Sequence, residues 1–309
     1  RQGEVARRLL VAFEQSKAPQ GQGAAWSIER VIPEIAAHAW AELPAAYGRA
    51  DMQWPAWPGV GPREGDPLVP SPFAGYEKTP FSWFWNKWNV LCDPSCNWHT
   101  KLPARRFVDW CLCLLRTGLA FVYLWEAEFY SRLHERVAQR ITPPQGPAVD
   151  RLRLFLEAGA ELATIEPLTV PASQKEMWRA TAELIAKGKV ARDRIFKVLE
   201  DQMTAPAGGD IHAILDGWIG SLRAADAQAI AAPLKPDPRT ANNQKEFVKY
   251  LLLPRVSDDD SVDQADFYYL AQSKTGNAWF RPGPEWLVVV TSLLCRRPGG
   301  QCTLGNQLR

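Results

Sequence analysis

The strongest periodic pattern in this chain lies between residues 103 and 140. Apolar positions recur there at steps of three and four, the spacing that places side chains on one face of an α-helix. The stripe comprises Phe107, Trp110, Leu114, Gly118, Phe121, Trp125, Phe129, Leu133 and Val137. The opposite face is also apolar as far as Glu126, and a helix that is apolar all round is buried all round. The pattern therefore predicts a central helix about 55 Å long, whose second half, with Arg132, Arg136 and Arg140, reaches solvent on one side.

Further segments with helical periodicity flank this central helix, and a segment with strand-like residues follows them. The remaining helices are predicted at about 4–14, 27–43, 150–164, 173–187, 190–204, 210–231 and 242–253. Beyond them, apolar and aromatic residues at 266–270 and 278–281 flank a Lys-Thr-Gly-Asn turn, which predicts a β-hairpin. Pro284 then opens a helix that runs to Leu294, because proline is well tolerated in the first turn.

Residues 51–102 form a segment that is rich in tryptophan and proline. The proline runs at 51–80 exclude a helix interior or a central strand there, and the three-residue spacing of Trp54 and Trp57 suits a polyproline-like strap. We interpret the segment as an ordered loop wrapped on the helical body. Trp54 and Trp57 are candidates for a partner-binding surface, because interfaces are enriched in aromatic anchors. The later tryptophans are assigned to the core: Trp83, Trp85, Trp88, Trp110 and Trp125.

The C-terminal segment carries a resemblance that bears on function. The helix at 285–295 is followed by a glycine turn at 298–300 and by the start of another helix, Cys302-Thr-Leu-Gly-Asn-Gln-Leu308. This order resembles the first half of a helix-turn-helix or winged-helix unit. In that family the next helix enters the major groove of DNA, which implies duplex DNA as a partner, although winged helices also bind proteins. The sequence ends at Arg309, before that helix, so we assign no base-reading residue and interpret the chain as part of a longer protein.

These patterns together predict a mainly α fold. It consists of a multi-helical body around a long central helix, a small β-hairpin and an incomplete winged-helix-like C-terminal segment. A proline-containing linker at 233–238 separates two predicted domains. The first, 1–232, is the helical body with the 51–102 loop. The second, 239–309, holds one helix, the hairpin and the winged-helix-like unit.

Composition narrows the class of protein. The formal net charge of +2 excludes a strongly basic protein that coats nucleic acid by bulk charge, but it allows a local basic face. The best membrane candidate, 107–125, contains Asp109 and Arg116. A charge near the bilayer centre costs about 3 kcal/mol, so we prefer a buried core helix and expect no membrane. Six cysteines beside an ample apolar core favour free thiols and a cytoplasmic location, and the alanine- and arginine-rich texture favours a bacterial source.

Three potential soft-metal ligands, Cys92, Cys96 and His99, lie within eight residues. Structural zinc takes four ligands in a tetrahedron. Further ligands would have to come from the next helix, where Cys111 and Cys113 face different ways. A turn around the intervening proline, with buried thiols, is the preferred interpretation. We therefore predict no cofactor and keep zinc as the alternative.

The clearest basic cluster lies on the predicted helical segment 187–197. Its members are Lys187, Lys189, Arg192, Arg194 and Lys197. Lys189, Arg192 and Lys197 are predicted to share one face while apolar residues face inward, and phosphate contacts need such a face. The alternative is an ordinary solvated helix surface. Arg132, Arg136 and Arg140 form a second stripe with the same two interpretations.

Motifs that would identify an enzyme do not occur in the sequence. It contains no phosphate-binding loop, dinucleotide fingerprint, serine elbow or paired metal-binding histidines. We therefore expect a non-enzymatic, nucleic-acid-associated accessory subunit of a bacterial multi-protein system, for example in DNA transactions or phage defence, with other protein subunits as partners. The alternatives are a protein–protein scaffold that uses the tryptophan-rich and winged-helix-like surfaces, and an enzyme whose site no short motif reveals.

Overall fold

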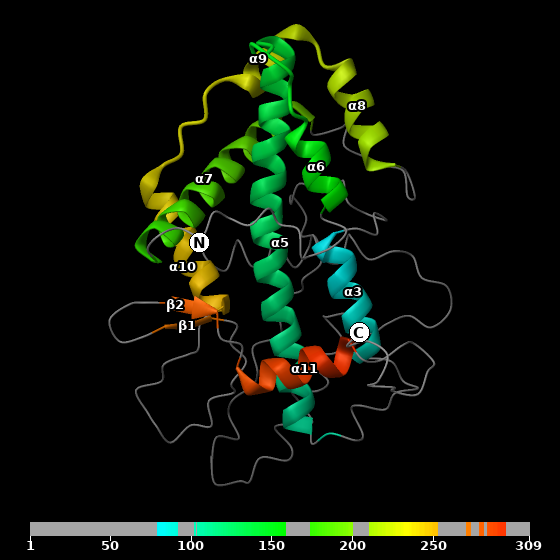
Figure 1. Cartoon of the computed structure of the whole chain (residues 1–309), viewed down its shortest axis with the longest axis vertical. Helices are drawn as coiled ribbons and strands as arrows, with labels where there is room; N and C mark the ends of the chain where they lie inside the picture. The colour runs from blue at the N-terminus through cyan, green and yellow to red at the C-terminus, as the bar shows by residue number, and fades with distance from the viewer. Residues whose placement is uncertain are drawn as a thin grey trace, which may run out of the picture. The chain divides into compact units, whose positions relative to one another are not determined.

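The computed structural model describes residues 79–91, 102, 104–158, 174–199, 210–252, 270–272, 278–280 and 283–294. These ranges hold eight helices and two short strands, so the prediction of a mainly helical protein is confirmed (Figure 1). The predicted helices at 4–14 and 27–43, the loop up to residue 78 and the start of a helix at 303 lie outside the described residues. The prediction of a loop over 51–102 was wrong at Pro80–Leu91, which forms helix α3, because the only proline of this stretch stands at its first position. Among the described helices, none is long and apolar enough to span a lipid bilayer.

The chain forms two compact units whose segments alternate along the sequence. The described part of the first unit comprises residues 79–82, 120–158, 174–199 and 210–249. The second unit holds residues 83–91, 102, 104–119, 250–252, the two strands and the last described helix. The sequence-based division into 1–232 and 239–309 stays a prediction.

Helix α5 (Ala104–Ile141), with 38 residues, confirms the predicted central helix. Its stripe is buried at Phe107, Leu114, Phe129, Leu133 and Val137, each no more than 1 % exposed. The other faces of its first half are buried as well, at Cys111, Cys113, Leu115, Leu119 and Val122. The helix ends where the Thr142 amide donates to the Ala138 carbonyl and two prolines follow, since proline cannot continue the helical hydrogen bonds.

In the second unit, α5 contacts α3 (Pro80–Leu91) and α11 (Pro284–Leu294) through small and hydroxyl side chains. A Cβ atom on Gly118 would lie 2.6 Å from the Phe84 ring of α3, so the glycine makes room for this aromatic side chain. The Trp286 indole N–H donates to the Thr117 hydroxyl at 3.0 Å. The Thr117 hydroxyl in turn donates to the Cys113 carbonyl at 2.9 Å. This chain of donors satisfies the polar N–H that a tryptophan carries.

The aromatic residues of the first unit pack along α5. Trp125 stacks on Phe129 of the same helix and on Phe155 of α6 (Arg151–Ala158). Tyr123 meets the Phe247 ring of α10 (Pro238–Leu252) edge to face. Helix α10 agrees in type with the helix predicted at 242–253 and begins four residues earlier, at Pro238. These ring contacts connect α5 with α6 and α10, which lie on opposite sides of it in Figure 1.

Helix α7 (Gln174–Leu199) is one continuous helix of 26 residues, so the predicted break between 173–187 and 190–204 was wrong. Gly188, which stands between the two predicted helices, lies where α7 crosses α5. A Cβ atom at this position would lie 2.4 Å from the backbone of Ala127. Glycine is needed here because it lets the two helix backbones approach closely, not because it ends a helix.

The single helix predicted at 210–231 was also wrong, because the chain forms α8 (Ile211–Ser221) and α9 (Ala224–Ala231). Asp210 caps α8 by accepting from the His212 amide, as its side chain is suited to do. Leu222 and Arg223 adopt extended backbone angles, and Leu222 is buried. The burial of this apolar side chain accompanies the bend, which periodicity alone does not reveal.

Strands β1 (Leu270–Gln272) and β2 (Ala278–Phe280) pair antiparallel, with Ala271 opposite Trp279. The turn between them lies outside the described residues, so the hairpin stays a prediction. Helix α11 has the predicted bounds, Pro284–Leu294. The continuation that would define a winged helix begins after Leu294 and is not described.

The crossing of α7 and α5 predicts a sharp contrast between two glycine substitutions. Gly188→Ala should destabilise the protein by about 1–3 kcal/mol, because the new methyl group meets backbone that must move. Gly217→Ala on α8 has nothing within 4 Å of the added carbon and should stabilise by about 0.5–1 kcal/mol. Urea denaturation of both variants measures this contrast. Equal effects of the two substitutions would contradict the close approach at Gly188.

Candidate nucleic-acid interface

The basic cluster predicted at 187–197 lies in the second half of α7. One face of this part of the helix is buried, at Gly188, Ala191 and Ile195. Lys187, Lys189 and Lys197 are exposed, whereas Arg192 and Arg194 are half-buried. The structure therefore separates the five predicted cations into three lysines at the surface and two arginines that pack against the protein.

Asp193 divides the exposed part of this cluster. Its carboxylate lies 2.6 Å from the Lys189 ammonium and 3.4 Å from the Arg192 guanidinium. Lys189, Asp193 and Lys197 follow one another at i, i+4 and i+8, so the carboxylate lies in the same row as the two lysines. Arg192 also lies 5.6 Å from the centre of the Phe196 ring. Within the described part of the chain, Lys187 and Lys197 are in no ion pair.

Arg194 binds the end of α9 instead of facing solvent as a phosphate ligand. Its guanidinium donates to the Ala232 carbonyl and, at 2.9 Å, to the Pro233 carbonyl. The Nε2 atom of His134 on α5 lies 3.1 Å from the same Ala232 oxygen, and a carbonyl only accepts, so Nε2 carries the hydrogen. Two side chains from two helices thus hold one backbone carbonyl, which gives Arg194 a structural role.

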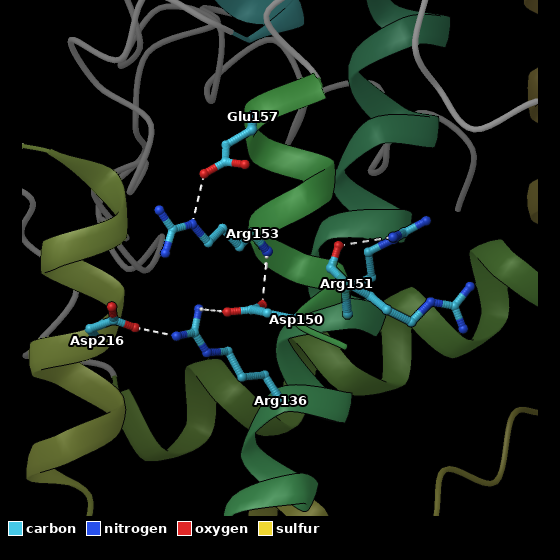
Figure 2. A network of polar contacts seen from close by, with 7 residues as sticks. Arg136, Asp150, Arg151, Arg153, Glu157 and Asp216 are labelled. Atoms are coloured by element: carbon cyan, nitrogen blue, oxygen red, sulfur yellow. Dashed lines mark hydrogen bonds and ion pairs between the residues drawn. The ribbon is translucent and has the colours of Figure 1, made fainter. Parts of the chain in front are cut away.

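The second predicted stripe, on the C-terminal half of α5, is used in the same way. Arg136 lies between Asp150 and Asp216, with 3.3 Å to Asp150 (Figure 2). Arg140 donates to the Gly220 carbonyl at 3.3 Å. These contacts attach α8 to α5. Arginine suits this role because its planar fork presents several donors at once.

Arg132 corrects the expectation that this stripe reaches solvent. It is 8 % exposed, and its guanidinium lies 5.1 Å from the centre of the Phe155 ring. It donates to Glu128 and, at 2.9 Å, to the Arg151 carbonyl. The spacing of the stripe was correct, but helix α6 covers its first member.

The other candidates from the sequence lie outside the described residues. These are the partner-surface tryptophans Trp54 and Trp57 and the possible zinc ligands Cys92, Cys96 and His99. Within the described ranges, no group of three or more His, Cys, Asp or Glu residues is placed to hold a metal ion. The core assignment of Trp85, Trp88, Trp110 and Trp125 is confirmed, since each is buried, whereas Trp83, assigned to the core as well, is half-buried.

Sequence reasoning missed the acceptors that decide the role of each arginine. Asp150 and Asp216 are far apart in the sequence and belong to no motif, and the Ala232 carbonyl is backbone. Only the tertiary arrangement brings them to Arg136 and Arg194. The presence of Asp193 within the basic segment was visible in the sequence, and its four-residue spacing from Lys189 was the one available signal of an ion pair.

Comparison with protein-family models, with curated proteins and with solved structures finds no significant match to this chain. The candidate interface is therefore assessed from its own residues.

The contact of His134 predicts a pH dependence of stability. Burial lowers the pKa of His134, as does Arg194, while the Ala232 hydrogen bond and Glu135 raise this pKa by less. The unfolded chain gains a proton as the pH falls past the ordinary value of 6.5, whereas the folded protein resists it until lower pH. Stability is therefore present above pH 6.5 and is lost as the pH falls. Urea denaturation at pH 7.5 and 5.5 should show a smaller loss in His134→Gln than in the wild type. Equal losses would contradict this prediction.

Proposed function

We propose that this chain is a non-enzymatic accessory subunit of a bacterial multi-protein system that contacts the backbone of nucleic acid. The observation that supports this proposal is the pair of exposed lysines on α7, Lys187 and Lys197, which are in no ion pair within the described residues. A rigid helix separates them by ten residues, about 15 Å along its axis. Such groups contact phosphates without reading sequence, as expected of an accessory subunit.

The role of the half-buried arginines limits the strength of this contact. Arg192 and Arg194 already have partners within the chain, and Asp193 offsets part of the charge of Lys189. Few phosphates are then neutralised, and affinity depends strongly on that number. A weak, salt-sensitive contact supports a subunit that acts beside other DNA-binding components. The predicted hairpin and the winged-helix-like segment after Leu294 supply the second contact in this proposal.

Charge reversal at the two exposed lysines tests this function. Lys187→Glu/Lys197→Glu should weaken duplex-DNA binding and lower the slope of log K against log salt by about 2, because each phosphate contact contributes about 0.9. Fluorescence anisotropy at several salt concentrations measures the slope. The matched control is Lys235→Glu/Arg239→Glu, which makes the same charge change at two exposed positions outside α7. An equal loss in the control would assign binding to overall charge and contradict the proposal.

A protein–protein scaffold is the second candidate function, and α11 favours it. Leu287 and Val288 are adjacent and about half exposed, at 48 % and 50 %. On the other side of the same helix Val289 is fully buried and Trp286 is held by Thr117. The helix is therefore anchored through one face while it presents apolar side chains on another. Exposed apolar residues that lie together are typical of protein-binding sites.

Serine substitutions distinguish this scaffold function from the nucleic-acid contact. Leu287→Ser/Val288→Ser should abolish co-purification of a protein partner from the native host while DNA binding is retained. The matched control is Val149→Ser/Leu154→Ser, which changes two apolar side chains that are 58 % and 50 % exposed in the first unit. Thermal melting of each variant verifies folding. Retention of the partner by the α11 variant would contradict the scaffold function of this surface.

A further inference from the structure

Helices α5 and α9 end beside one another in the first unit and leave an open hollow between their last turns. The hollow has a volume of about 410 Å³, within the range of sites for small organic ligands. Its lining comes from the end of α5 with the following Thr142 and from the end of α9 with the following Ala232, namely Glu135, Ala138, Gln139, Ile141, Thr142, Gln228, Ala231 and Ala232. Figure 1 shows α9 beside the last turns of α5.

The charge of this lining has one sign. Glu135 is its one charged residue, and lysine and arginine are missing from the lining. The last carbonyl groups of a helix lack partners within the helix, and each helix C-terminus is equivalent to roughly −0.5 of a charge. Both helices contribute such an end, although the Ala232 carbonyl after α9 already accepts from Arg194 and His134. The hollow therefore favours a cation over an anion.

The neighbouring arginines bind backbone carbonyls. Arg194 donates to the Ala232 and Pro233 carbonyls, and Arg140 donates to Gly220. Glu135 accepts only a long hydrogen bond of 3.5 Å from Gln139, and within the described residues no ion pair involves Glu135. Arg194 contributes one opposing charge near Ala232, while Glu135 and the two helix ends together amount to roughly −2. The net charge around the hollow therefore remains negative.

The hollow also has an apolar side. Ala138, Ile141 and Ala231 line it beside the amides of Gln139 and Gln228. An alkylammonium group matches this combination, because its stem packs on apolar side chains while its charged end needs oxygen acceptors. We propose that the hollow between α5 and α9 binds a primary alkylammonium group, with Glu135 as its counter-ion. The group belongs either to a free aliphatic polyamine or to a lysine side chain of a protein partner.

Titration with small amines tests the site directly. Backbone amide NMR shifts are followed on adding n-butylammonium, with 1-butanol as the neutral ligand of similar shape. Butylammonium should shift the amides of 135–142 and 228–232 and butanol should not. Glu135→Gln should raise the Kd at least about tenfold, since a hydrogen bond to a charged group contributes that much or more. Ala231→Leu should prevent binding by filling the hollow, with unchanged melting.

Glu183→Gln is the matched control, because it removes the same charge from an exposed position of α7 outside the lining. It should leave the Kd of butylammonium unchanged. The Kd of 1,4-diaminobutane is then compared with the Kd of the tripeptide Gly-Lys-Gly. Tighter binding of diaminobutane indicates a free polyamine, and tighter binding of the tripeptide indicates a lysine of a protein partner. Absence of shifts at the hollow, binding of butanol as tight as that of butylammonium, or an equal effect of Glu183→Gln would each overturn the proposal.

Discussion

The absence of a solvent-facing side along much of α5 is the constraint on which both compact units depend. Apolar and aromatic residues predominate on every face of this helix from Phe107 to Trp125 and continue along one stripe to Val137, and burial of each large side chain stabilises the fold by about 1.5–3 kcal/mol. Each unit covers its own section. Phe84 and Trp286 do so in the second unit, whereas the neighbours of Trp125 and the α7 backbone at Gly188 do so in the first.

Arginine side chains hold the elements of the first unit together where apolar burial ends. Arg132, Arg136 and Arg194 connect helices to carbonyls and carboxylates of other segments. A guanidinium presents several donors in a fixed plane, so one side chain satisfies two acceptors at once. This structural use explains why an arginine-containing helix is not by itself a phosphate-binding surface, and why the lysines of α7 are the better candidates.

Two different parts of the first unit suit ligands of opposite charge. Helix α7 carries the exposed lysines, and the ends of α5 and α9 form a hollow with a single carboxylate. One surface favours anions and the other favours cations, although the net charge of the whole chain is only +2. Local arrangement therefore decides the chemistry of possible partners, and the overall charge does not.

The sequence by itself determined the elements whose pattern is long and strong. The period at 103–140 placed α5 to within about one residue, and Pro284 marked the start of α11. The sequence identified the lysines of α7 as part of a basic cluster, but it did not reveal which residues would surround them. Tertiary structure decided that Gly188 is a crossing point, that Leu222 bends α8 from α9, and that Arg132 and Arg194 have structural partners. The reason is physical. The local preferences of a glycine are the same whether it ends a helix or lies at a helix crossing, and those of an arginine are the same at the surface or in a contact. Only the segment that packs against the residue distinguishes these cases.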